Sequence, residues 1–402
     1  MNCSTLTTLN LRINNFGGNL SALNFSTLLN LRKLDLGNNM FTGSFPVSLF
    51  SCKSLTALRL AENNLTGQIP EEILTLQSLS YLSLSRNSLT NISDAIRILM
   101  GCRKLSAVIL SKNFCNSSLP DDGSLEFPDG FQNLQVFALG NCQLKGQLPA
   151  WLGKLKNLQV LDLSFNQITG TIPSWLKNLP RLFYIDLSSN FISGEFPKEL
   201  AQLSALTSTW DEEETSYLEL PVFVWPNNRT TQQYNQLSIL PPAIYLRNNS
   251  LSAEIPIQIG QLKLLHVLDL SDNSFTGNIP DEISNLTNLE ALYLSGNRLS
   301  GEIPASVKSL HFLSSFSVAN NNLQGSIPSG GQFDTFPNPV TMAIQACVVQ
   351  LYSALVQINQ ELSIQKILKK PLITHFLRGS SRGLFSGLLL DLLVHYYSLS
   401  TG

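Results

Sequence analysis

The fold is decided by a stretch that runs Leu289-x-x-Leu292-x-Leu294-x-x-Asn297-x-Leu299-x-Gly301-x-Ile303-Pro304. The same spacing occurs at residues 55–70 and returns along most of the chain, with copies mostly 24 residues apart. One slot of each copy holds Asn, or once Cys, and the twelve slots are Asn14, Asn39, Asn63, Asn87, Asn113, Cys142, Asn166, Asn190, Asn249, Asn273, Asn297 and Asn321. Self-similarity at a fixed period predicts a stacked repeat rather than several globular domains.

Each position of the repeat has a physical reason. The Leu-x-Leu core predicts a short strand, whose alternate residues face opposite sides, so that its leucines point inward onto those of the next repeat. The Asn is expected to be buried, with its amide satisfying backbone groups of the turn. Gly permits a tight bend, and Pro fixes φ where the convex side begins. The sequence therefore predicts a right-handed leucine-rich-repeat solenoid, an α/β repeat with one short parallel strand per repeat.

The composition narrows the class of protein. The chain has 402 residues, of which 43% are hydrophobic and only 13% charged, and its net charge is −2. The absence of a basic excess argues against nucleic-acid binding. Six cysteines are too few for a disulfide scaffold in a chain of this length.

The period breaks most strongly between Asn190 and Asn249, where about 35 residues are added. This insertion starts with acidic residues and continues with Tyr217–Trp225, a β-branched and aromatic run that predicts a strand. Pro221 suits an edge strand. Long ordered loops are usually functional, so the insertion is either a packing flap or a platform for a ligand.

These breaks predict four segments. Leucine-rich repeats occupy residues 1–206, the insertion 207–241, further repeats 242–337, and a tail without the repeat pattern 338–402. Three interpretations of the tail stay open: a helix covering the last repeat, out-of-frame or intron sequence with no designed structure, and an amphipathic membrane-surface segment.

Several runs carry a resemblance to a known family. The Leu-x-Gly-x-Ile-Pro form of the repeat resembles the plant-type leucine-rich repeat of receptor-like kinases and receptor-like proteins. Glu219-Leu-Pro-Val-Phe-Val, Gln232-Gln-Tyr-Asn-Gln-Leu and Gly330-Gly-Gln-Phe-Asp-Thr-Phe-Pro337 are similar to the tyrosine-sulfated glycopeptide receptor and its kinase-less relatives, and more distantly to the phytosulfokine receptor. In these families the insertion is termed an island. The resemblance covers roughly residues 4–337.

The resemblance implies a cell-surface receptor at the plasma membrane that recognises a small secreted peptide, some of them tyrosine-sulfated, and joins a smaller leucine-rich-repeat co-receptor kinase. Carried over to this chain, the peptide would pair with the strand at Glu219–Trp225 and lie against the concave face. The alternatives are a leucine-rich-repeat scaffold for protein–protein interaction and an inert truncated relic.

Strand residues between the leucines are expected to face solvent on the concave surface. Near the insertion these are Tyr184, Asp186, Tyr245, Arg247, Val267, Asp269, Ala291 and Tyr293. Tyr and Arg are common interface anchors, and a sulfate would be bound by Arg247 or Arg229. The predicted ligand-binding set is Glu219, Val222, Phe223, Val224, Trp225, Arg229, Tyr245, Arg247, Asp269 and Tyr293.

Other chemistry finds little support in the sequence. Gly379–Gly383 matches a nucleophile motif by letter, but the flanking strand and helix that this motif needs are not predicted. We expect no enzyme, no metal site and no small-molecule cofactor. Among nine N-x-S/T sequons, the glycosylation candidates are Asn64, Asn116, Asn228 and Asn285.

The sequence does not show the signal peptide and membrane helix that the resemblance to cell-surface receptors implies. The first residues lack the basic start and apolar core of a signal peptide. No stretch reaches the ~18 uninterrupted apolar residues of a membrane helix. As written, the chain is expected to be neither secreted nor membrane-spanning, unlike the receptors that it resembles.

Overall fold

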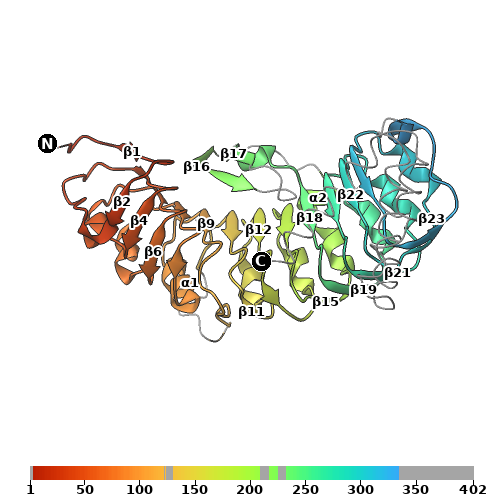
Figure 1. Cartoon of the computed structure of the whole chain (residues 1–402), viewed down its shortest axis with the longest axis horizontal. Helices are drawn as coiled ribbons and strands as arrows, with labels where there is room; N and C mark the ends of the chain where they lie inside the picture. Colours follow the sequence, from red (N-terminus) through yellow and green to blue (C-terminus); the bar gives the residue numbers. More distant parts are fainter. Residues whose placement is uncertain (1–2, 122, 124–129, 209–216, 225–231, 335–402) are drawn as a thin grey trace, which may run out of the picture. The chain divides into compact units, whose positions relative to one another are not determined.

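The computed structural model describes residues 3–121, 123, 130–208, 217–224 and 232–334 (Figure 1). These residues all belong to one compact unit of the chain. The predicted tail, 338–402, lies outside the described residues, as do the acidic start of the insertion and part of the loop that follows Asn113.

The predicted solenoid is confirmed by a parallel sheet of twelve strands among the described residues. In spatial and chain order these are β1 (Thr8–Asn10), β3 (Lys33–Asp35), β5 (Ala57–Arg59), β7 (Tyr81–Ser83), β9 (Ala107–Ile109), β10 (Val136–Ala138), β12 (Val160–Asp162), β14 (Tyr184–Asp186), β18 (Ala243–Tyr245), β20 (Val267–Asp269), β22 (Ala291–Tyr293) and β24 (Ser315–Ser317). Each strand pairs with the next in strict register, so that Leu34 faces Leu58 and Leu268 faces Leu292. The sheet lines the concave face of this unit (Figure 1).

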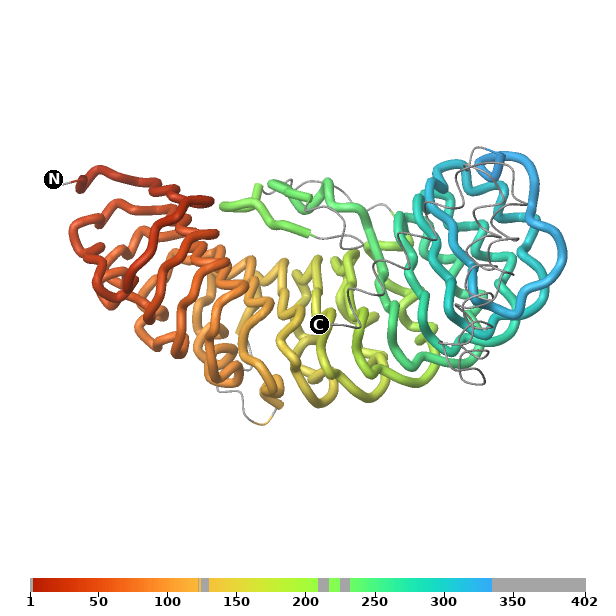
Figure 2. Tube along the Cα trace, in the orientation of Figure 1, coloured from red at the N-terminus to blue at the C-terminus, as the bar shows by residue number. Residues whose placement is uncertain are grey.

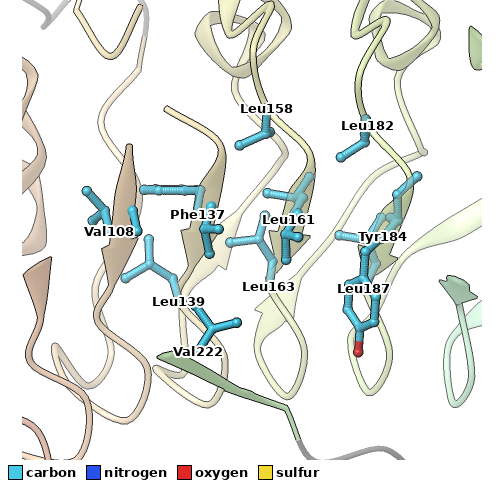
Figure 3. Packing of buried hydrophobic residues seen from close by; sticks show 14 of the residues in the cluster. Val108, Phe137, Leu139, Leu158, Leu161, Leu163, Leu182, Tyr184, Leu187 and Val222 are labelled. Carbon is cyan, nitrogen blue, oxygen red and sulfur yellow. The ribbon is translucent and has the colours of Figure 1, made fainter. Parts of the chain in front are cut away.

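The middle residue of each strand forms the core. Leu58, Leu161 and Leu268 are completely buried, and the leucines two residues after each of them are buried as well. Figure 3 shows such side chains from β10, β12 and β14 pointing between the strands and toward one another. Because a single repeat cannot enclose its own leucines, the stacking of neighbours supplies the hydrophobic stabilisation.

The Asn ladder is also confirmed, and Asn166 shows its geometry. Its Nδ2 donates to the carbonyl oxygens of Leu139 and Leu163, both at 2.9 Å. Its Oδ1 accepts hydrogen bonds from the backbone N–H groups of Cys142 and Leu144, both at 3.0 Å. The side chain therefore joins two successive repeats. The other ladder asparagines inside the stack repeat this pattern, for example Asn297.

The predicted parallel strand of each repeat is confirmed in the main sheet, and many repeats add a second short strand after the Asn turn, which was not predicted. These flanking strands are β2 (Gly17–Asn19), β4 (Met40–Gly43), β6 (Asn64–Gly67), β8 (Ser88–Leu89), β11 (Lys145–Gly146), β13 (Gln167–Ile168), β15 (Ser193–Glu195), β19 (Ser250–Glu254), β21 (Ser274–Thr276), β23 (Ser300–Glu302) and β25 (Asn322–Gln324). The missed signal is the short polar and apolar alternation after the Asn, which is only two to five residues long.

The Gly of the repeat is needed for its backbone conformation. Gly301 has φ +75°, and the Gly slots of most other repeats are likewise left-handed. Ala253 occupies one such slot with φ 66°. A left-handed conformation is unfavourable for a residue with a Cβ, so this position carries local strain.

The convex side is built from short helices, most of which begin directly after the repeat proline. They are η1 (Leu20–Ala22), η2 (Val47–Ser51), η3 (Glu71–Thr75), η5 (Ala150–Lys154), η6 (Ser174–Asn178), η7 (Lys198–Gln202), η10 (Ile257–Gln261), η11 (Asp281–Asn285), η12 (Ala305–Ser309) and η13 (Gly331–Asp334). Pro70 and Pro173 hold the N-cap with φ −80° and −73°. The longer spacing between Asn87 and Asn113 accommodates a full α-helix, α1 (Ile92–Met100).

The insertion follows α2 (Ser204–Thr207) and contains an antiparallel pair, β16 (Tyr217–Val224) and β17 (Gln232–Gln236), before η9 (Leu237–Ile239). The predicted strand is thus confirmed for Tyr217–Val224, whereas Trp225 lies outside the described residues. We call this pair of strands, β16 and β17, the hairpin. The hairpin lies over the concave face of the solenoid (Figure 2).

Candidate functional site

The hydrogen-bond ladder between the two strands of the hairpin is interrupted by a bulge, and this bulge contacts the solenoid. Val222 pairs with Tyr234 and Tyr217 with Gln236, and the register shifts between them. The segment that bulges out includes Pro221, which has no N–H to give to a ladder. Its carbonyl is bound instead by the solenoid.

Three neighbouring concave strands bind this bulge. Lys33 on β3 donates from Nζ to the Glu219 carbonyl oxygen at 2.9 Å and forms an ion pair with the Glu219 carboxylate at 2.9 Å. Tyr81 on β7 donates its hydroxyl to the Pro221 carbonyl oxygen at 3.0 Å. Arg59 on β5 donates to the same oxygen from Nη2. The bulge is therefore docked on the N-terminal repeats, although the hairpin is inserted between β14 and β18.

Arg59 is the centre of this contact. It is only 3% exposed, and its Nη1 pairs with the Asp35 carboxylate at 2.9 Å. Its guanidinium lies 5.1 Å from the Phe223 ring centre and 5.3 Å from that of Tyr81. Arg12 lies 4.5 Å from the Phe223 ring centre as well. Burial raises the pKa of Tyr81, and the charge and hydrogen bond of Arg59 act against that rise.

The strand residues of the hairpin divide between two environments. Val222 is buried and belongs to the hydrophobic core cluster, and Figure 3 shows it on the hairpin strand among the cluster residues of the solenoid. Phe223 and Val224 are half-buried. Alternation along β16 thus directs Val222 toward the core and leaves Phe223 between the two arginine side chains.

The tyrosines expected to be exposed on the concave face are buried, so this expectation was wrong. Tyr184 and Tyr245 are 5% and 8% exposed. Their rings pack with centroids 5.6 Å apart, because they stand on adjacent strands at neighbouring positions. Burial raises the pKa values of both hydroxyls, and the neighbouring Asp186 carboxylate adds to this effect. Tyr293 is half-buried.

Next to these tyrosines, the concave face carries three aspartate side chains. Asp162 and Asp186 stand side by side on β12 and β14, and Asp269 is buried on β20. Each receives hydrogen bonds from the backbone N–H and the hydroxyl of the serine two residues later, as with Ser188 Oγ at 2.6 Å from Asp186. Burial and the neighbouring Asp162 raise the pKa of Asp186 to about 7. This part of the face is acidic and tyrosine-rich.

The sequence predicts Arg247 in a strand, but β18 ends at Tyr245, so Arg247 lies two residues beyond it. Its Nε lies 3.4 Å from the Asp272 carboxylate, with both side chains about half exposed. Arg229, the other predicted sulfate ligand, lies outside the described residues.

Three of the four glycosylation candidates are described. Asn64 stands on β6, Asn116 follows the Asn113 turn, and Asn285 ends η11, and all three side chains are exposed. Asn228 lies outside the described residues.

Within the described ranges, His, Cys, Asp and Glu side chains form no group of three suited to a metal ion. In the same residues, no helix combines the length and apolar character that a membrane crossing requires.

The sequence prediction missed the docking residues Lys33, Asp35, Arg59 and Tyr81. A signal was present, because charged and aromatic residues stand at strand positions flanking the inward leucines in three successive repeats. Their partner is about 140 residues or more away in sequence, so spacing alone gave no reason to connect them.

A stack of Asn-laddered repeats with a concave parallel sheet defines a leucine-rich-repeat protein. The comparisons agree: family models described as "Leucine rich repeat" match residues 132–192, 156–208 and 243–299, and another described as "Leucine Rich Repeat" matches 30–52 and 54–76. Receptor-like protein 3 of Arabidopsis thaliana is 58% identical over 255 residues, which are 63% of this chain and 34% of that protein. Phytosulfokine receptor 2 of the same plant is 48% identical over 185 residues, 45% of this chain and 17% of that protein.

Solved structures of plant receptors share the fold. The TDR receptor aligns with a TM-score of 0.63 and 27% identity, over 81% of this chain and 53% of that one. The crystal structure of PEPR1-AtPEP1 aligns with a TM-score of 0.60 and 27% identity, over 81% of this chain and 43% of that one. This chain is therefore a leucine-rich-repeat protein by its fold and is similar to plant receptor-like proteins, and it spans about a third or less of the length of the curated relatives named above.

Proposed function

We propose that this chain is a ligand-binding part of a plant cell-surface receptor or receptor-like ectodomain, and that it recognises a small secreted peptide. The peptide would lie between the hairpin and the concave sheet, in an extended conformation. The single observation that carries this proposal is the position of the hairpin over the concave face, docked at one end on Arg59 and Tyr81.

The surfaces available there suit an extended peptide. The hairpin is a two-stranded sheet, and a peptide strand pairing with it would gain affinity from main-chain hydrogen bonds and specificity from alternate side chains. Phe223 and Tyr293, both half-buried, offer aromatic contacts. Asp162 and Asp186, which are half-buried, favour a basic or hydrogen-bond-donating group on this part of the face.

Structural neighbours give independent support for a peptide ligand and a co-receptor. Plant peptide hormone receptor RGFR1 in complex with RGF2 aligns with a TM-score of 0.51 and 30% identity, over 81% of this chain and 57% of that one. The Arabidopsis receptor kinase HAESA, in complex with the peptide hormone IDA and the co-receptor SERK1, aligns with a TM-score of 0.54 and 26% identity, over 81% and 55%. By analogy, we place this protein at the extracellular face of the plasma membrane with a leucine-rich-repeat co-receptor kinase as partner.

The test is calorimetric titration of the whole chain with a panel of short synthetic peptides, each made with sulfated and with unmodified tyrosine. We expect one peptide to bind with micromolar or tighter affinity. Deletion of residues 219–225, or Tyr293→Ala, should weaken that binding at least tenfold. Phe191→Ala is the matched control, since this aromatic side chain is 60% exposed and lies outside the concave strands. Unchanged affinity after the deletion would refute the hairpin as part of the site.

Comparing the sulfated and unmodified forms of the peptide tests whether Arg247 recognises a sulfate group. If Arg247 reads a sulfate, Arg247→Ala should weaken the sulfated peptide more than the unmodified one. Equal losses would show that this residue does not recognise sulfate, while leaving peptide binding itself intact.

A further inference from the structure

The outer side of the β16 bulge is occupied by donors from within the chain. The Glu219 carbonyl oxygen accepts from Lys33, and the Pro221 carbonyl oxygen accepts from Arg59 and Tyr81. The three donors stand on consecutive strands at one end of the sheet, whereas the hairpin leaves the stack after β14 and rejoins it at β18. The hairpin therefore spans the concave face between these two places.

Arg59 makes this docking more than a surface contact. A guanidinium that is nearly fully buried needs its counter-ion and its hydrogen-bond acceptors in place, because an unpaired buried charge is costly. Asp35 supplies the charge, and Pro221 and the Tyr81 hydroxyl, 2.5 Å from Nη2, supply acceptors. Phe223 covers the guanidinium. When the hairpin leaves, the Pro221 acceptor and the Phe223 cover are lost together, so docking is expected to be cooperative.

We propose that the hairpin is a strap across the concave face and that Arg59 is the positioning residue that latches it to the N-terminal repeats. Release of the Arg59–Pro221 contact would then open the face between β5 and β18. The use of that face by a ligand rests on the proposed function, but the latch itself does not.

The experiment measures hydrogen–deuterium exchange of the full chain without ligand. The main variant is Asp35→Leu with Arg59→Leu, which removes both charges and so leaves no unpaired buried ion. We expect the amides of Phe223, Val224 and 232–236 to exchange roughly ten to a hundred times faster, as expected for losing charged hydrogen bonds that close a local unit. Exchange in β12 and β14 should not change.

Milder variants separate a latch from a general structural role. Tyr81→Phe removes one donor to Pro221 and should accelerate hairpin exchange only a few-fold, while Arg59→Lys keeps the charge beside Asp35 and should give an intermediate value. The matched control is Arg103→Leu, since Arg103 is an exposed arginine and should leave hairpin exchange unchanged.

Two outcomes would overturn the latch. One is unchanged hairpin exchange in all three latch variants. The other is equal acceleration in the hairpin and in β12 and β14, because Arg59 would then stabilise the repeats rather than the strap. Should the double variant fail to fold, the two milder variants decide. A failure of every peptide to bind would refute the proposed function and leave this exchange result standing.

Discussion

Replacing the ladder residue Asn166 by Ala should show how much one side chain contributes to the stacking of repeats. The substitution leaves three buried backbone groups without a partner, namely the N–H groups of Cys142 and Leu144 and the carbonyl oxygen of Leu139. The Leu163 carbonyl oxygen keeps a hydrogen bond from the Asn190 side chain. An unsatisfied buried polar group costs about 1–3 kcal/mol. Because water can enter the space left by the amide, the low end applies to each of the three groups, and we expect a loss of about 3 kcal/mol in unfolding free energy.

Urea denaturation followed by circular dichroism measures this loss, and hydrogen exchange in β10, β12 and β14 locates it. The matched control is Asn157→Ala, whose side chain makes one exposed hydrogen bond, to the Gln132 carbonyl at 2.7 Å. That change should cost about 1 kcal/mol or less. Equal effects of the two substitutions would contradict the ladder reasoning, since a buried bridge and an exposed single bond would then be worth the same.

Further predictions follow from single positions. Ala253→Gly should raise the unfolding free energy by about 1 kcal/mol, because glycine accepts the left-handed backbone without strain; a loss of stability on thermal denaturation would refute this. Phe137→Ala should cost roughly 3–5 kcal/mol through loss of its packing with Phe131 and Trp151, measured by the same denaturation. The pKa of Asp186, raised from 3.8 to about 7, means that the folded state binds a proton that the unfolded state releases, so stability should fall as pH rises from 4 to 7. Asp186→Asn should flatten that slope, and an unchanged slope would show that another group causes it. On expression in a plant secretory pathway, Asn64→Gln should remove one glycan, seen by mass spectrometry.

Spacing in the sequence was sufficient for the solenoid because each repeat specifies its own local structure. The alternation around the paired leucines predicts a strand, and the Asn and Gly slots predict the turn, without reference to distant residues. Stacking follows because neighbouring repeats present the same leucine face. The strand at Tyr217–Val224 was likewise predictable from its β-branched and aromatic residues.

The exposure of the side chains on the concave face was harder to predict. Whether a side chain between the leucines is exposed depends on what covers it, and this is why Tyr184 and Tyr245 proved to be buried. Arg247 was assigned to a strand because spacing alone does not show where a three-residue strand ends.

The sequence by itself determined the repeat, its register and the place of the insertion, because these depend on contacts between residues at most a few tens of positions apart. Only the tertiary structure decided where the hairpin docks. That contact joins Arg59 to Pro221, 162 positions away, and it depends on the path of the stacked repeats, which brings the two residues together. No local pattern contains that information, since it arises from the sum of many small rotations between successive repeats.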